Sequence, residues 1–350
     1  MWRGLGPDLG SIPPVIAAIA AAAAQAPPTP VLLAIELATV HLTSASKVLI
    51  QGITEPLGQT YAPLMRSYGT RVVAGVSPGW GQTEVAGIPV FDLVEQAIAA
   101  AGEVDVAVVF VPPYEVLDAV LEAISAGIRQ ILITTGGVPP MDMVQLVRVA
   151  EATETLIVGP NCPGIIVPGE LLLGMHPAEF YSPGPVGLIS RSSTLSYEVA
   201  NHLTRAGLGQ SIVASIGADR VLGSSLQQWL QILDEDERTE VIVLLGEVSG
   251  NNEFAAAPHI AAAIDKPVIA YIAGRYAPID RTMGHANAII AARLAIAGRG
   301  QGDVTEKLAA LKEAKVKIAE TPSQIPTLVK RALTQRRRAA ARPTPADPAP

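Results

Sequence analysis

A histidine, a carboxylate and a hydroxyl cluster in the second half of the chain have the chemistry to carry a phosphoryl group. His285 lies in a glycine-containing loop, Glu247 follows an apolar block, and Ser192 to Thr194 open a helical pattern. A neutral imidazole can attack a phosphoryl group when a carboxylate holds its other ring nitrogen, and a helix N-terminus can stabilise the phosphate. These residues predict phosphoryl transfer through His285, against the plainer alternative of a surface or core histidine.

Three glycine-rich loops in the first half could approach a ligand closely. Gly52 to Gly58 and Gly75 to Gly81 follow apolar blocks, where small residues let backbone amides reach a phosphate. They favour a nucleotide-like ligand, with ordinary tight turns as the alternative. No acidic residue is placed to bind a ribose, which disfavours a Rossmann dehydrogenase. In the third loop, Gly159 to Gly164, Cys162 has no activating base nearby in sequence, so we expect a stiff loop whose backbone lines a pocket.

Short β-branched blocks alternate with helical patterns and must position these loops. The first half has apolar blocks at 48–50, 72–74, 106–111, 131–133 and 156–158, with helical patterns near 58–68, 92–101, 114–126 and 141–151. After an expected linker around 165–183, blocks recur at 186–189, 212–214, 241–245 and 268–272. This alternation predicts two α/β units with parallel sheets. The carboxyl ends of parallel strands share an edge, so His285, Glu247 and Ser192 should converge there.

The composition indicates a protein with large buried interiors. Of 350 residues, 49% are hydrophobic and 16% charged, and the formal net charge is −7. The mean hydropathy is +0.36, but no long run is apolar enough for a polytopic membrane protein. The negative charge provides no general attraction for nucleic acid. A single cysteine and the absence of short histidine pairs predict a reducing compartment and no metal site.

Both ends differ in composition from the middle. Residues 1–43 form an Ala/Pro-rich extension in which Ala24-Gln25-Ala26 mimics a signal-peptidase site. Asp8 and a weakly basic start favour a dispensable extension or a misassigned start codon, and hence a cytoplasmic protein. Residues 335–350 combine an arginine run with alanine and proline, which predicts a disordered tail.

The order of motifs resembles the alpha subunit of succinyl-CoA synthetase, the ADP- or GDP-forming succinate–CoA ligase. The resemblance spans about residues 45 to 333 and rests on SKVLIQG, GVSPG, GPNCPGIIVPGE, GLISRSSTLSYE, LLGEVSG, AYIAGRYAP and MGHANAII. It implies a Rossmann-type CoA-binding domain over 44–168 and a flavodoxin-like parallel α/β domain over 169–334. It also implies a tricarboxylic acid cycle ligase that uses succinate, CoA and phosphate. ATP or GTP and magnesium would bind to a partner beta subunit with an ATP-grasp domain.

The resemblance also implies roles for individual residues. His285 would be the phosphohistidine, Glu247 would orient its imidazole, and Ser192, Ser193 and Thr194 would hold the phosphate. Tyr197 would lie near the subunit interface. The expected CoA contacts are Thr54, Glu55, Pro56, Leu57, Trp80, Thr134, Thr135, Gly136, Asn161 and Cys162.

Several positions depart from the family pattern. The family usually has glycine at Glu55, lysine at Trp80 and glutamate at Gly136, and glycine also at Ser193 and Asn287. An added acid and a lost cation remove charge-assisted contacts worth roughly 1.5 to 3 kcal/mol each, so we expect weakened CoA binding. Stacking of Trp80 on adenine could compensate. These changes keep two alternatives open: a degenerate CoA-binding or regulatory subunit, and a related enzyme such as a malate–CoA ligase.

Overall fold

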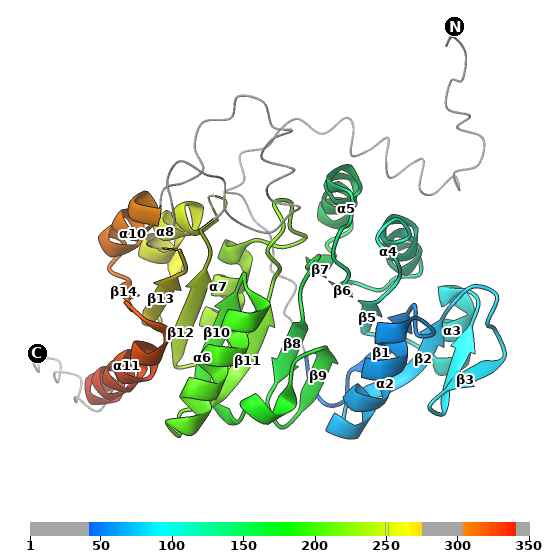
Figure 1. The fold of residues 1–350 in the computed structure, drawn as a ribbon, viewed down its shortest axis with the longest axis horizontal. Coiled ribbons are helices and arrows are strands. Elements are labelled where there is room, and N and C mark those ends of the chain that lie inside the picture. The colour runs from blue at the N-terminus through cyan, green and yellow to red at the C-terminus, as the bar shows by residue number, and fades with distance from the viewer. Residues whose placement is uncertain (1–41, 249, 251, 275–303, 341–350) are drawn as a thin grey trace, which may run out of the picture.

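The computed structural model describes residues 42–248, 250, 252–274 and 304–340. These residues form two sheets that lie side by side, each flanked by helices (Figure 1). The first sheet has the order β3-β4-β2-β1-β5-β6-β7, and all its pairs are parallel except β3 with β4. Its strands are β1 (Lys47–Gln51), β2 (Arg71–Val76), β3 (Thr83–Val85), β4 (Ile88–Phe91), β5 (Val106–Val109), β6 (Gln130–Ile133) and β7 (Leu156–Val158).

Both faces of the first sheet are buried, as expected for parallel strands between helices. Alternate residues of β1 enter different cores: Val48 and Ile50 pack with Met65 of α2, whereas Leu49 packs with Val120 of α4. The covering helices are α2 (Pro56–Tyr68) on one face, and α3 (Val94–Ala101), α4 (Val116–Ser125) and α5 (Pro140–Ala152) on the other. The predicted α/β class and parallel sheet are confirmed for this half.

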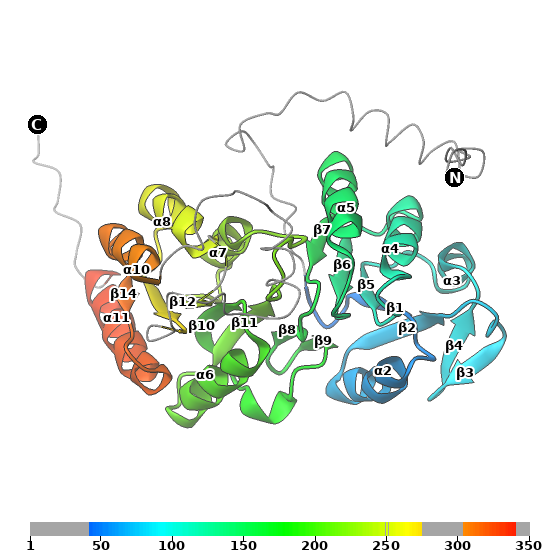
Figure 2. The same ribbon diagram turned by 45° about the horizontal axis from the view of Figure 1, so that its top comes forward.

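The second sheet has the order β14-β13-β12-β10-β11-β8-β9. Helices α6 and α11 contact each other on one face, and α8 contacts both α7 and α10 on the other (Figure 2). The strands are β8 (Gly164–Val167), β9 (Leu171–Gly174), β10 (Pro183–Ser190), β11 (Gln210–Ser215), β12 (Val241–Gly246), β13 (Val268–Ile272) and β14 (Lys317–Ile318). The helices are α6 (Ser193–Arg205), α7 (Leu226–Glu235), α8 (Asn252–Ala263), α10 (Val304–Glu313) and α11 (Ile325–Ala340), with 3-10 turns η2 (Ala178–Phe180) and η3 (Pro322–Gln324).

The first part of the expected linker around 165–183 is instead a buried hairpin. Strand β8 pairs antiparallel with both β11 and β9, so the second sheet begins at Gly164 and the expected domain boundary at 168 falls inside it. The hairpin also contacts the first unit. Thr70 exchanges two hydrogen bonds with the backbone of Leu172, at 2.7 and 3.0 Å. The apolar residues of the hairpin, rather than its prolines and glycines, decide its structure because they can be buried between the two units.

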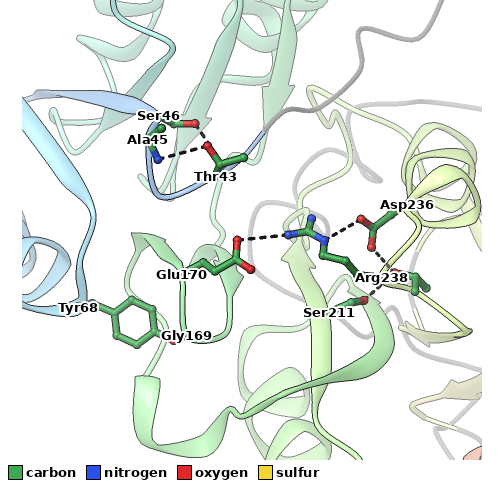
Figure 3. A network of polar contacts seen from close by, with 10 residues as sticks. Thr43, Ala45, Ser46, Tyr68, Gly169, Glu170, Ser211, Asp236 and Arg238 are labelled. Atoms are coloured by element: carbon green, nitrogen blue, oxygen red, sulfur yellow. Dashed lines mark hydrogen bonds and ion pairs between the residues drawn. The ribbon is translucent and has the colours of Figure 1, made fainter.

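The turn between β8 and β9 is held from both sides (Figure 3). The Gly169 amide donates to the Tyr68 hydroxyl at the end of α2, at 2.8 Å. On the other side, Arg238 lies between Glu170 (3.5 Å) and Asp236 (2.9 Å). These ion pairs are partly exposed, and such pairs contribute at most about 1 kcal/mol. The buried hairpin is therefore the main connection at this seam.

The expectation of a disordered tail from residue 335 is wrong for its first part. Helix α11 continues to Ala340, because its arginine run has an acidic partner just before β12. Arg337 donates to both carboxylate oxygens of Glu240, at 2.9 and 3.1 Å, and Arg336 donates to the Glu240 carbonyl at 2.9 Å. The Arg337 guanidinium lowers the pKa of Glu240. Residues 341–350 and the extension before residue 42 lie outside the described residues.

Candidate functional site

The loop after β1 leads directly into α2 at the carboxyl edge of the first sheet. Helix α2 has Glu55 as its N-cap and Pro56 at its first position, and the Glu55 side chain makes no capping hydrogen bond. The amides of Leu57 and Gly58 lie in the first turn, where no intrahelical acceptor exists. The adjoining strands β2 and β5 lie on opposite sides of β1, which is where open α/β sheets bind ligands. This helix start can therefore receive an anionic group, although the Glu55 carboxyl lies beside it.

The loop after β2 is fixed next to this helix start. The Thr54 hydroxyl donates to the Ser77 hydroxyl at 2.9 Å. Asp92 accepts hydrogen bonds from the amides of Gly79 (2.7 Å) and Gly81 (2.9 Å), and thereby closes the loop around Trp80. Trp80 is 56% exposed. Thr54 and Trp80, predicted from separate motifs, thus lie on two adjacent loops.

The loops after β6 and β7 present mainly backbone to the same edge. The hydroxyls of Thr134 and Thr135 donate to the carbonyls of Val109 and Val111, at 2.9 and 2.7 Å. The Asn161 amide donates to the Thr135 carbonyl at 2.9 Å. Gly136 is exposed. The two threonine side chains therefore hold the loop in place and leave its glycines at the edge.

Cys162, whose expected contact with CoA stays a prediction, does not present its thiol to this edge. It is 2% exposed, and its Sγ donates to the Ile133 carbonyl at 3.3 Å. Burial raises the pKa of the Cys162 thiol to about 12. The thiol therefore stays protonated and packs in the core, because a buried thiolate is costly without a cation beside it.

At the carboxyl edge of the second sheet, Glu247 and the start of α6 line one pocket of about 470 Å³. The expected convergence of these two elements is therefore present in the fold. The residues lining the pocket are Ser192, Thr194, Leu195, Glu198, Glu247, Val248, Tyr271, Ala273 and Pro322.

The start of α6 is shaped to receive an anion. Ser192 is the N-cap, and its side chain makes no capping hydrogen bond. The Ser190 hydroxyl instead accepts from the Ser192 amide (3.0 Å) and donates to the Ser192 carbonyl (2.7 Å), which fixes the turn. The amides of Ser193 and Thr194 lie in the first helical turn without intrahelical acceptors. These amides and the helix dipole favour a bound phosphate.

His285, the residue expected to carry the phosphate, lies outside the described residues, as does Asn287. Glu247, the residue expected to orient it, follows β12 and is 8% exposed. The described part of the site is therefore the phosphate-binding start of α6 and the carboxylate, both at the pocket.

Tyr197 is half-buried and packs inside the chain. Its ring lies edge-on to that of His176, with 5.7 Å between centroids. His176 is buried and contacts the Tyr181 hydroxyl (2.7 Å) and the Gly164 carbonyl (2.9 Å). Burial lowers the pKa of His176 to about 4 and raises that of Tyr197 to about 12. The expected place of Tyr197 near a subunit interface stays a prediction.

Asp219, which sequence reasoning missed, connects the edges of the two sheets. It accepts a hydrogen bond from the Asn161 side-chain amide at 3.0 Å, and its carbonyl accepts from Arg191 Nη2 at 3.0 Å. Its position just after β11 is the available signal, because polar residues at the carboxyl ends of parallel strands are site candidates. Glu253 and Lys307 were also missed, and both contact the backbone of Glu247.

The described ranges contain neither a cluster of metal ligands nor a membrane-spanning helix. There, no three His, Cys, Asp or Glu side chains gather as a metal site would require. No described helix combines the length and apolar character needed to cross a membrane.

Comparison with known proteins gives the same two-part division. Residues 43–137 match a CoA binding domain, and residues 183–298 match a succinyl-CoA ligase like flavodoxin domain. The chain is 44% identical over 285 residues to the succinate–CoA ligase [ADP-forming] subunit alpha 2 of Archaeoglobus fulgidus, covering 81% of this chain and 96% of that one. It is 42% identical over 282 residues to the alpha subunit of Aquifex aeolicus, covering 80% and 90%.

Among solved structures, the fold is similar to ATP citrate lyase from Methanothrix soehngenii in complex with citrate and coenzyme A. The TM-score is 0.75 at 21% identity, over 89% of this chain and 53% of that chain, so this likeness supports the fold alone. The relatives, by contrast, match at high identity over nearly their whole length. The chain therefore belongs to the family of succinate–CoA ligase alpha subunits.

Proposed function

We propose that this chain is the alpha subunit of an NDP-forming succinate–CoA ligase. The enzyme interconverts succinyl-CoA, NDP and phosphate with succinate, CoA and NTP. The observation that carries this proposal is the shared pocket of Glu247 and the α6 N-terminus, in a chain 44% identical to an archaeal alpha subunit. We assign His285 as the residue that carries the phosphoryl group between the two half-reactions.

The charges at the pocket favour an imidazole as the group between them. A phosphate at the start of α6 and the Glu247 carboxylate repel each other unless a proton-bearing group separates them. A neutral imidazole meets this need, because one ring nitrogen donates to a carboxylate while the other attacks phosphorus. The amides of Ser193 and Thr194 then stabilise the phosphate that the histidine carries.

Coenzyme A is the substrate proposed for the first-sheet edge. The open start of α2 and the exposed glycine at 136 leave backbone amides for phosphate and pantetheine groups. Trp80 can stack on the adenine, since its ring is exposed on the neighbouring loop. Glu55 opposes the CoA phosphates, so we expect lower CoA affinity than in a chain with glycine at that position.

The proposed partner is a beta subunit with an ATP-grasp domain that binds the nucleotide and magnesium. Assembly of this kind is expected in the cytoplasm, where succinate, CoA and ATP are available.

The test is phosphorylation and turnover of the reconstituted pair. The chain is mixed with a beta subunit of the same family and ATP labelled at its γ-phosphate, and the label is then followed on the alpha chain. We expect an acid-labile, base-stable phosphate on His285, and succinyl-CoA when succinate and CoA are added. His285→Asn should abolish both, and His202→Asn, at a partly exposed helix position, should abolish neither.

Glu247→Gln provides the matched test of the carboxylate. Glu198 also lines the pocket but is exposed, so Glu198→Gln serves as the control for charge removal. We expect Glu247→Gln to slow phosphorylation by roughly 10- to 100-fold, as expected for loss of a charge-assisted hydrogen bond, and Glu198→Gln to change it little. A pair that assembles but never transfers phosphate to the alpha chain would reject the enzyme and favour a regulatory subunit.

A screen of short dicarboxylic acids separates succinate–CoA ligase from a related ligase. Each acid is supplied with CoA and ATP, and its thioester is measured. Preference for succinate by kcat/KM supports the proposal. Preference for malate would instead assign a malate–CoA ligase.

A further inference from the structure

Two buried charged side chains contact the backbone of Glu247, and a third lies beside one of them. Arg191 follows β10, Glu253 lies in the first turn of α8, and Lys307 lies in α10, with exposures of 2%, 0% and 0%. They come from segments that are distant in sequence and meet behind the pocket wall. None of them lines the pocket itself.

Glu253 and Lys307 hold the two polar groups of Glu247's backbone. The Glu247 amide donates to Glu253 Oε1 at 3.0 Å, and Lys307 Nζ donates to the Glu247 carbonyl at 2.7 Å. Lys307 Nζ also pairs with Glu253 Oε2 at 2.8 Å, which closes a ring of contacts. The ring fixes Glu247 at both its amide and its carbonyl.

The space for this ring exists because residue 246 is glycine. A Cβ on Gly246 would lie 2.7 Å from Glu253 Cγ and 2.5 Å from Ile272 Cδ1. Contacts this close are not tolerated between real carbon atoms without displacement. The Glu253 side chain can therefore extend beneath β12 only because residue 246 has no side chain.

Arg191 connects the ring to the other wall of the pocket. Its Nη1 lies 3.9 Å from Glu253 Oε1, and its Nη2 donates to the carbonyls of Ala218 (3.2 Å) and Asp219 (3.0 Å). Arg191 directly precedes Ser192, the N-cap of α6. One buried network thus holds both Glu247 and the start of the phosphate-binding helix.

Such a network is poorly explained as a device for stability. Desolvation of a buried ion pair usually consumes most of its Coulomb energy, and apolar replacements of both partners are often as stable. The contacts of Glu253 and Lys307 converge instead on the backbone of Glu247, a carboxylate of the pocket. Such contacts can fix where the Glu247 carboxylate lies. Residues that do not touch the reacting atoms commonly orient the groups that do.

We propose that Glu253 and Lys307 are positioning residues that hold Glu247 in the geometry needed for phosphoryl transfer. The inference rests on the proposed function, which supplies the reaction, while the contacts themselves belong to the described structure. Lys307 is the more informative partner, because its ammonium contacts both the Glu247 carbonyl and the Glu253 carboxylate.

The experiment compares Lys307→Met with the double variant Glu253→Gln/Lys307→Met in the complex with the beta subunit. Lys307→Met leaves Glu253 buried without its lysine and should lower the melting temperature. The double variant removes both charges and should recover much of that stability. It still lacks the donor to the Glu247 carbonyl, so we expect phosphorylation to remain roughly 10- to 100-fold slower than in wild type. The KM for CoA should not change.

The control is Lys312→Met, which removes an exposed lysine from the same helix and should leave both measurements unchanged. If the phosphorylation rate of the double variant recovers together with its stability, the ion pair is merely structural and the inference is overturned. A change in the KM for CoA without a change in the phosphorylation rate would overturn it as well.

Amide hydrogen exchange at Glu247 separates this inference from the proposed function. We expect its amide to exchange at least roughly tenfold faster in Lys307→Met and in the double variant, because in both the accepting side chain at position 253 has lost its lysine partner. Unchanged exchange refutes positioning even if the enzyme is active. If the wild-type pair accepts no phosphate, the proposed function fails, and the exchange data still decide whether Lys307 fixes Glu247.

Discussion

Replacing Gly58 with alanine tests how closely α2 packs on the loop that follows β1. Gly58 is the third residue of α2, and an added Cβ would overlap the Gly52 carbonyl oxygen and lie 2.8 Å from Ile53 Cα. These are backbone atoms of the loop that leads to Thr54 and Glu55, so no flexible side chain can move away. The methyl group must displace either the helix or the loop.

The sign of the stability change makes this test informative. In an unhindered helix, Gly→Ala stabilises by about 1 kcal/mol, because alanine has the higher helix propensity. Overpacking against fixed atoms costs about 1 to 3 kcal/mol. The contacts at Gly58 are closer than ordinary packing, so we expect the overpacking cost to dominate and Gly58→Ala to destabilise by about 1 to 2 kcal/mol.

Urea unfolding measures the free energy, and Trp80 fluorescence reports CoA binding on the neighbouring loop. We expect CoA affinity to fall by roughly tenfold, because displacement weakens at least one charge-assisted contact. Thr60→Ala, at an exposed position of the same helix, is the control and should change stability by less than about 0.5 kcal/mol. A Gly58→Ala protein as stable as wild type, with unchanged CoA affinity, would refute the close packing inferred here.

Three further changes test other parts of the structure. The folded chain keeps His176 neutral down to about pH 4, whereas the unfolded residue protonates near 6.5. The stability that neutral His176 contributes is therefore complete above pH 6.5. Between pH 6.5 and pH 4, the free energy of unfolding falls by up to about 1.4 kcal/mol per pH unit. His176→Gln should flatten this pH dependence in urea titrations. Trp80→Lys should tighten CoA binding roughly tenfold in calorimetry, by adding a cation beside the CoA phosphates. Lys266→Met should cost about 1.5 to 3 kcal/mol in urea unfolding, because Lys266 donates to two carbonyls at the end of α7.

Each of these changes has a control on the same chain. His202→Gln should leave the pH dependence intact, because His202 is partly exposed; an equal slope in His176→Gln and wild type would contradict the buried neutral state. Weaker CoA binding in Trp80→Lys would indicate that the indole ring, and not the missing cation, determines affinity. Lys330→Met, which replaces an exposed lysine, is the control for Lys266→Met. If both variants lose the same free energy of unfolding, Lys266 does not cap α7 specifically.

The sequence predicted those elements that its local pattern defines. The β-branched blocks at 48–50, 131–133 and 241–245 are strands of the two sheets, and the α/β class is confirmed. Because parallel strands align their carboxyl ends, the same reasoning brought Glu247 and Ser192 to one pocket. In contrast, proline and glycine around 165–183 suggested a linker where a buried hairpin forms, since the partners of that hairpin are remote in sequence.

What the sequence alone determined is the type of chemistry and the order of the elements, because residue identity and apolar spacing are local properties of the chain. The tertiary structure alone decided which charges support the site. Lys307 is sixty residues from Glu247, yet its ammonium donates to the Glu247 carbonyl. Such a contact depends on how α10 packs against α8 beneath the sheet edge. A buried charge needs partners at hydrogen-bond distance, and only the folded chain determines which residues provide them.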